Sequence, residues 1–168
     1  MHNVPERPAK TVTAPTREQA ADLIVAYANA LDDVQLDAWP HFFTEDALYH
    51  VTTRENHEAD LPIGIVRCLG RGMMTDRVKA FHSANVFEPH TYNHVIGRPA
   101  FSEVQSSAVL SVRSNFHVVR TMESGRMDLF AAGKYLDEVV LDEERARFQK
   151  RVVVLESRNV DILVVIPL

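Results

Sequence analysis

The sequence contains a single cysteine, Cys68, and this scarcity limits the redox chemistry that the chain can carry. One thiol forms no internal disulfide, and it cannot supply the two thiolates of a Rieske cluster or the four of other iron–sulfur clusters. A reducing cytoplasm is therefore the expected compartment. Cys68 lies in an apolar stretch, where a free cysteine usually behaves as a small hydrophobic residue.

Long apolar runs and an excess of positive charge are also missing. No apolar run reaches the ~20 residues of a membrane span, so no membrane partner is expected. The formal net charge is -5, which gives no support to a nucleic-acid partner. The N-terminal stretch is polar, contains Pro5, Pro8 and Pro15, and has no signal-peptide core. We expect residues 1–15 to form a loosely ordered tail and residues 16–168 to form one domain.

The usual catalytic motifs are absent as well. The sequence has neither a GxSxG nucleophile elbow nor a GxGxxG dinucleotide loop. Gly70-Arg71-Gly72 lacks the spacing of a phosphate loop and is more simply a turn between strand and helix. His90 and His94 would share a metal on a helix, but the residues around them favour extended chain. In a strand they would stand about 13 Å apart, so we expect no metal in this chain.

What the sequence does contain is a long region of strand pattern near its C-terminal end. Apolar residues alternate with polar ones over residues 108–118, a period of two that predicts a strand. Gly125 lies in a turn sequence after it, and a second strand is predicted from about Met127 to Val140, with Met127, Leu129, Ala131 and Tyr135 on one face. A charged turn at residues 142–145 leads to a third strand. Because the turns are short, the three strands must pair antiparallel.

Helices are predicted in the first half of the chain. Thr16 and Gln19 fit a capping box, and apolar residues then recur at helical spacing to Leu31. A short helix with Leu36, Trp39 and Phe43 on one side follows; Pro40 is tolerable only in its first turn. Strands are predicted around residues 47–51 and 63–69, with a polar loop at 52–57 between them. A third helix follows residue 72, and residues 87–101 suggest an irregular strand or a long connection.

Helices followed by a long antiparallel meander indicate an α+β fold in which a curved sheet forms an open cone around the N-terminal helices. Such a cone could enclose an acid–base pocket, with Tyr49, Tyr135 or His117 beside an aspartate. These residues could equally fill or line the core, which is the commoner situation.

Ordered motifs extend this interpretation. Over about four fifths of its length the chain resembles the small (beta) subunit of aromatic-ring-hydroxylating dioxygenases, the Rieske non-heme iron oxygenases. The matching segments, in the family's order, are Trp39 with Phe42–Ala47, Thr53–Asn56, Cys68 with Gly70–Met74, Asp76–Val78, Ser114–Phe116 with Arg120–Thr121, Gly133–Tyr135 with Asp137, and Asp161–Leu168. The resemblance is strongest to members acting on aromatic carboxylates, such as terephthalate or benzoate.

The resemblance implies a cystatin-like, nuclear-transport-factor-2-like cone and a hexamer of three large and three small subunits. It places the Rieske [2Fe-2S] cluster and the mononuclear Fe(II) in the large subunit, and no cofactor or catalytic residue in this chain. Electrons would come from NADH or NADPH through a reductase, with or without a ferredoxin. The small subunit would trimerise and support large subunits that cis-dihydroxylate an aromatic ring with O2.

A structural subunit must offer surface to its neighbours. The polar interface candidates are Arg54, Glu55, Asn56, Arg71, Arg77, His90, Tyr92 and His94. The apolar stretch at residues 162–166 is either the centre of an interface or a strand buried within the monomer. Two alternatives stay open: a free-standing dehydratase or isomerase with its own acid–base pocket, and a non-catalytic small-molecule binder. A deep polar pocket would favour the enzyme, whereas one filled by aromatic and aliphatic side chains would count against it.

Overall fold

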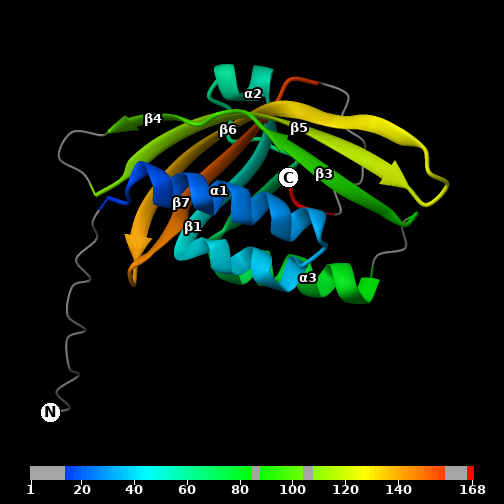
Figure 1. Cartoon of the computed structure of the whole chain (residues 1–168), viewed down its shortest axis with the longest axis horizontal. Helices are drawn as coiled ribbons and strands as arrows, with labels where there is room; N and C mark the ends of the chain where they lie inside the picture. The colour runs from blue at the N-terminus through cyan, green and yellow to red at the C-terminus, as the bar shows by residue number, and fades with distance from the viewer. Residues whose placement is uncertain (1–13, 85–87, 104–107, 158–165) are drawn as a thin grey trace, which may run out of the picture.

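One curved sheet arches over helices α1 and α3, and the short helix α2 lies on the opposite face (Figure 1). The computed structural model describes residues 14–84, 88–103, 108–157 and 166–168. The elements are α1 (Arg17–Asp32), the 3-10 helix η1 (Leu36–Phe42), β1 (Phe43–Thr53), α2 (Arg54–Glu58), β2 (Val66–Leu69), α3 (Gly70–Ala84), β3 (His90–Ile96), β4 (Ala100–Glu103), β5 (Leu110–Met122), β6 (Met127–Asp142) and β7 (Arg145–Leu155). We call the sheet face toward α1 the inner face and the face toward α2 the outer face. The predicted α+β cone is confirmed.

Helix α1 begins at the predicted capping box. The Gln19 backbone N–H donates to Thr16 Oγ1 at 3.1 Å, and the Thr16 N–H donates to Gln19 Oε1 at 2.9 Å. Two of the N–H groups that every helix start leaves without intrahelical partners are thereby satisfied. The apolar stripe of the helix is buried against the inner face: Ala20, Leu23, Ile24, Tyr27 and Leu31.

The strands are arranged in the order β2-β1-β7-β6-β5-β3, and β4 also pairs with β5. The predicted antiparallel meander of β5, β6 and β7 is confirmed. Gly125 adopts a φ of +83° in the turn between β5 and β6, a conformation that glycine takes without steric cost. Strand β1 pairs parallel with β7, although more than half of the chain lies between them. No local pattern predicted this pairing, which brings the two halves of the chain together.

Alternation is regular in β5, where even-numbered residues from Leu110 to Val118 are buried on the inner face. In β6 it is interrupted, because the partner of Val118 is Ala131 whereas the partner of Val119 is Leu129. Phe130 is the extra residue of this β-bulge, and such a residue reverses which parity faces the core. The prediction that Met127 and Leu129 share the face of Tyr135 is therefore wrong.

Two further predictions, for residues 52–57 and for Pro40, differ from the structure. The expected polar loop at residues 52–57 instead completes β1 and forms α2, and Thr53 caps that helix by accepting from the Asn56 N–H at 3.4 Å. The segment with Pro40 is a 3-10 helix, and Pro40 lies well inside it rather than in the first turn. Its carbonyl still accepts the Phe43 N–H at the helix end, so proline costs this short element one donor but no acceptor.

The prediction of an irregular strand or a long connection at residues 87–101 is wrong for the described part of that segment. Residues 90–96 form β3 and residues 100–103 form β4, and both pair antiparallel with β5. The third helix begins at Gly70 rather than after Gly72. Of the apolar stretch at residues 162–166, all but Ile166 lies outside the described residues, as does the tail up to residue 13.

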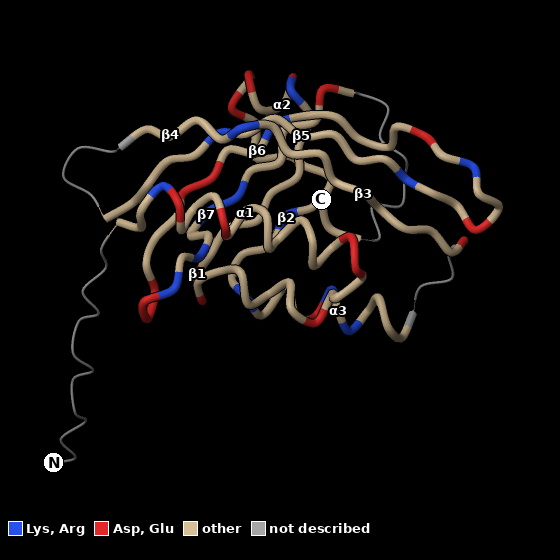
Figure 2. Tube along the Cα trace, viewed as in Figure 1, with Lys and Arg blue, Asp and Glu red and all other residues tan. Residues whose placement is uncertain are grey.

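Charges of both signs are distributed over the described chain, and in the β6–β7 hairpin acidic residues of β6 lie opposite basic residues of β7 (Figure 2). In the same part of the chain, no helix is long and apolar enough to cross a bilayer.

Candidate functional site

The centre of the cone holds Leu168, which is clamped by two tyrosines. The Tyr27 hydroxyl donates to the Leu168 carbonyl at 2.8 Å, and the Tyr49 hydroxyl donates to the same oxygen at 3.0 Å. The Leu168 N–H donates back to Tyr49 Oη at 2.9 Å, and Trp39 Nε1 donates to Tyr27 Oη at 3.1 Å. Burial raises the pKa of Tyr49 well above its ordinary value, so its hydroxyl stays protonated and keeps its role as a donor.

A buried ion pair crosses the inner face beside this clamp. Arg151 donates from Nε and Nη2 to the two carboxylate oxygens of Asp137, at 2.9 and 2.7 Å, and both side chains are fully buried. Its guanidinium also lies 4.1, 4.2 and 3.9 Å from the ring centroids of Tyr27, Tyr135 and Phe148. Burial alone would lower the pKa of Arg151, but the Asp137 carboxylate raises it overall, so the guanidinium remains charged.

Side chains therefore occupy the space where an acid–base pocket was considered. Tyr49 and Tyr135 lie inside the cone, but they touch other aromatic rings, and Phe116 stacks on Tyr135 at 4.1 Å between centroids. His117 lies on the outer face and is exposed, so its placement in the cone is wrong. A centre filled by aromatic and aliphatic groups counts against a free-standing enzyme that uses this cavity.

Asp32 and His94 form a dyad that the sequence did not reveal. Asp32 Oδ1 lies 2.5 Å from His94 Nδ1, and Asp32 Oδ2 accepts the His94 backbone N–H at 2.9 Å. The imidazole is 0% exposed, so the dyad ties the end of α1 to β3 rather than presenting a base to solvent. The residues are 62 positions apart, and only the extended course of β3 brings them together.

The interface candidates fall into three separate places. Arg54, Glu55 and Asn56 lie on α2, which sits above the outer face (Figure 1). The Arg54 guanidinium pairs with Glu156 at 2.9 Å. Arg71 and Arg77 lie on α3, on the other side of the sheet. The Arg71 Nη2 donates to the carbonyl of Phe43 within the same chain.

The third group lies on β3. Tyr92 is buried and stacks on Phe130 at 5.0 Å between centroids, and the His94 ring is buried with Asp32. His90 is half-buried at the end of the strand, with Nδ1 2.8 Å from the carbonyl of Glu88. The structure therefore does not unite the eight candidates in one patch.

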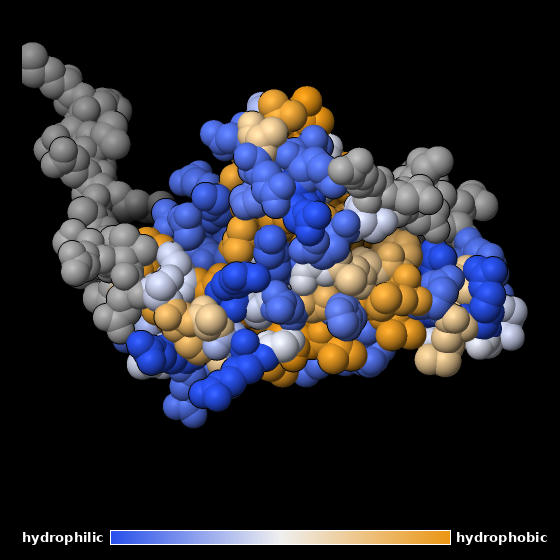
Figure 3. All heavy atoms as spheres, turned by 90° about the horizontal axis from the view of Figure 1, so that it is seen from above, coloured by the Kyte–Doolittle hydropathy of each residue, from blue (hydrophilic) through white to orange (hydrophobic). Residues whose placement is uncertain are grey.

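Apolar side chains are exposed where the sequence did not predict them. The bulge in β6 turns Met127 and Leu129 outward, and they are 66% and 65% exposed. Val95 of β3 is 56% exposed and lies diagonally across β5 from Leu129. We call Val95, Met127 and Leu129 the outer apolar patch. Apolar side chains gather on this face, in the right-hand half of Figure 3. Contiguous exposed apolar area commonly marks a protein interface.

Metal ligands are not assembled in the part of the chain that the structure describes: no group of three or more His, Cys, Asp or Glu side chains lies together there. Cys68 is buried in β2, and burial raises the pKa of its thiol, which disfavours the thiolate form that binds metals. The described residues thus do not fit an iron centre or an iron–sulfur cluster.

A sheet curved over N-terminal helices, with its interior occupied, defines this protein as a nuclear-transport-factor-2-like cone. The sequence profile of the ring hydroxylating beta subunit family matches residues 26–161. The chain belongs to that family and is a small subunit of a ring-hydroxylating dioxygenase.

Relatives agree with this membership. The chain is 37% identical over 150 residues to a beta subunit of the terminal oxygenase component of terephthalate 1,2-dioxygenase from Comamonas sp, covering 89% of this chain and 97% of the relative. It is 35% identical over 142 residues to the small subunit of anthranilate 1,2-dioxygenase from Burkholderia cepacia, covering 84% and 88%. A solved structure from Novosphingobium aromaticivorans, assigned as the beta subunit of an aromatic-ring-hydroxylating dioxygenase, superposes with a TM-score of 0.82 at 32% identity, covering 90% and 96%.

Proposed function

We propose that this chain is a structural subunit that trimerises and supports the large subunits of a multicomponent dioxygenase. The observation that carries the proposal is the occupied cone, in which Tyr27 and Tyr49 are committed to Leu168 and Arg151 to Asp137. A chain whose interior is committed to its own stability contributes surface to an assembly rather than a reaction site.

The redox centres belong to the partner in this proposal. The large subunit carries a Rieske [2Fe-2S] cluster and a mononuclear Fe(II), and three copies of each subunit form the hexamer. Electrons arrive from NADH or NADPH through a reductase, with or without a ferredoxin. The buried single thiol of Cys68 supports this division, because a cluster needs at least two accessible thiolates. A cytoplasmic location is part of the same proposal, because a single reduced thiol is typical of proteins in a reducing compartment.

The substrate of the assembly is an aromatic carboxylate that is cis-dihydroxylated with O2. Support comes from the relatives, whose names refer to terephthalate and anthranilate, both aromatic carboxylates. This chain's own contribution is to hold the large subunits in place.

The outer apolar patch is the proposed centre of a subunit contact, with polar candidates around the molecule as additional contacts. Arg54, Glu55 and Asn56 are the best placed of these, because helix α2 projects from the outer face. Arg71, Arg77 and His90 are candidates at other sites, whereas the buried Tyr92 and His94 would act by shaping β3. Three identical chains around a threefold axis would form heterologous contacts that close a ring.

Affinity purification from the native host tests the proposal. A larger iron-containing chain with Cys-x-His and Cys-x-x-His motifs is expected in equal amount, and elemental analysis should place the iron in that chain. Isolation of this chain by itself, with turnover of a substrate in the absence of iron, would show that the proposal is wrong.

A further inference from the structure

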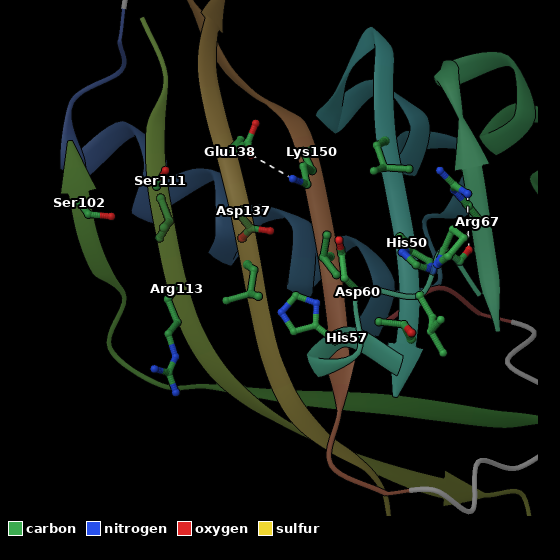
Figure 4. A pocket seen from close by; sticks show the side chains of 17 residues that line it. His50, His57, Asp60, Arg67, Ser102, Ser111, Arg113, Asp137, Glu138 and Lys150 are labelled. Carbon is green, nitrogen blue, oxygen red and sulfur yellow. Dashed lines mark hydrogen bonds and ion pairs between the residues drawn. The ribbon is translucent and has the colours of Figure 1, made fainter. Parts of the chain in front are cut away.

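A groove of about 490 Å³ lies on the outer face, away from the occupied interior (Figure 4). Its floor follows from strand register. His50 lies opposite Val152, Val152 opposite Leu136, and Leu136 opposite Arg113, so one row crosses β1, β7, β6 and β5. Adjacent strands are about 4.8 Å apart, which places Leu136 directly beside Arg113 and Val152 one strand further along the same row.

One wall of the groove is α2 and the loop that follows it. His57, Asp60, Leu61 and Pro62 line this side. In Figure 4 His57 reaches over the floor between β6 and β7, with Arg113 on one side and Asp60 on the other. The apolar floor residues Leu136 and Val152 thus lie between Arg113 on one side and His50 on the other, with His57 over them.

Most charged groups in the groove are committed to partners. Lys150 Nζ lies 3.1 Å from Glu138 Oε1, and Arg67 Nη1 is 3.4 Å from the carbonyl of Pro62. Burial and the charge of Arg67 lower the pKa of His50, so its imidazole is neutral near pH 7.

Arg113 and His57 differ from these groups. Within the described chain, neither side chain has a hydrogen bond or an ion pair, and both line the same space. A guanidinium with free donors binds a carboxylate through two parallel hydrogen bonds, and an imidazole N–H can donate a further one.

We propose that the groove is a binding site for a small organic acid with a flat apolar body. Its carboxylate is held between Arg113 and His57, and its ring or chain rests on Leu136 and Val152. Asp60, on the far side of His57, repels a second anion there and so fixes the carboxylate at the Arg113 end. The volume lies in the ~300–1,000 Å³ range of small-molecule sites. The groove shares helix α2 with the proposed subunit contact but is lined by other residues of it, and the binding proposal does not rest on the scaffold role.

Titration of the full-length, 15N-labelled chain with benzoate tests this site by NMR. Saturable shifts are expected at the groove residues, with a Kd on the order of 1 mM, because the groove is open and the probe is small. Replacing Arg113 with methionine, which keeps the apolar stem, should weaken binding by about tenfold or more, since a charge-assisted contact is lost. His57→Gln should weaken it less.

Two controls distinguish specific binding in the groove from nonspecific binding of benzoate to the protein surface. Arg145→Met removes an exposed arginine outside the groove and should leave benzoate binding unchanged. Benzamide has the same ring without the charge and should bind at least about tenfold more weakly. The proposal is overturned if shifts are absent up to about 20 mM benzoate, if benzamide binds equally well, or if Arg113→Met behaves like Arg145→Met. None of these results depends on whether a large subunit co-purifies.

Discussion

At the scale of single residues, the pair formed by Arg151 and Asp137 has the largest expected effect on stability. Both side chains are 0% exposed, and three aromatic rings surround the guanidinium. Such a pair is costly to break, because the remaining charge stays buried without its partner, although replacing both members by apolar groups can be nearly neutral.

Asp137→Asn is therefore expected to lower the free energy of unfolding by about 3–5 kcal/mol, measured by urea denaturation. Glu138→Gln is the matched control, because its partner Lys150 is partly exposed, and it should cost less than about 1 kcal/mol. The double variant Asp137→Leu with Arg151→Met should recover most of the loss. If Asp137→Asn lowered the free energy of unfolding no more than Glu138→Gln does, the buried pair would not stabilise the fold as proposed.

His50 supplies a pH dependence at the same scale. Burial, followed by the charge of Arg67, lowers its pKa in the folded protein below the value of 6.5 expected for the unfolded chain. The unfolded chain then binds the proton more readily between the two pKa values. Stability is therefore fully present above about pH 6.5 and declines as the pH falls through the lower, folded pKa.

Urea midpoints at pH 7.5 and about pH 5.5 check this linkage. His50→Gln should reduce the difference between the two midpoints relative to the wild-type protein. His117→Gln changes an exposed histidine of the outer face and should leave the difference nearly as it is. An unchanged difference in His50→Gln would mean that another group titrates.

At the scale of elements, close approach of β6 and β7 makes Gly133 necessary. A Cβ at Gly133 would lie 2.2 Å from the Val154 carbonyl oxygen and 3.2 Å from Leu155 Cα, and backbone atoms cannot move aside alone. The two strands must separate to admit a side chain at the end of their ladder, where Gly133 lies opposite Leu155.

Gly133→Ala is expected to destabilise the fold by about 1–3 kcal/mol in thermal or urea denaturation. Gly72→Ala provides an opposite control, because a Cβ there meets nothing within 4 Å and the position is in α3. Alanine loses less backbone entropy in a helix, so this variant should gain about 0.5–1 kcal/mol. Equal effects of the two substitutions would contradict the packing argument.

At the scale of the whole molecule, the proposed assembly depends on the outer apolar patch. Leu129→Lys should abolish or strongly reduce co-purification of the large subunit or of the trimer, because a charge would be buried in the contact. The fold itself should be unaffected, since the side chain is 65% exposed.

Val25→Lys is the control for this prediction, because Val25 is 53% exposed on α1, away from the patch. It should assemble as the wild-type chain does. Size-exclusion chromatography with light scattering measures the assembly, and circular dichroism checks the fold. If Leu129→Lys assembles as the wild-type chain does, the outer apolar patch is not part of the subunit interface.

Local features of the fold could be predicted because their causes are local. Thr16 and Gln19 are three residues apart and cap the same helix start, and the alternation in β5 predicts its buried face without knowledge of its neighbours. The strands β3 and β4 were not predicted as regular strands, because Gly97 and Pro99 obscure the alternation. The outward turn of Met127 and Leu129 depends on a bulge, which no periodic pattern shows in advance.

The sequence by itself determined the α+β class, the antiparallel meander, the helix start at Thr16 and the family, since each depends on residues close in the chain or on their order. Only the tertiary structure decided which polar groups meet. Asp32 reaches His94 across 62 positions, and Tyr49 reaches Leu168 across 119. Such contacts are set by the packing of α1 and of the chain end against the sheet, which many distant residues determine together. Strand register places Arg113, Leu136 and Val152 in one row across three strands and so forms the floor of a groove that no pattern in the sequence predicted.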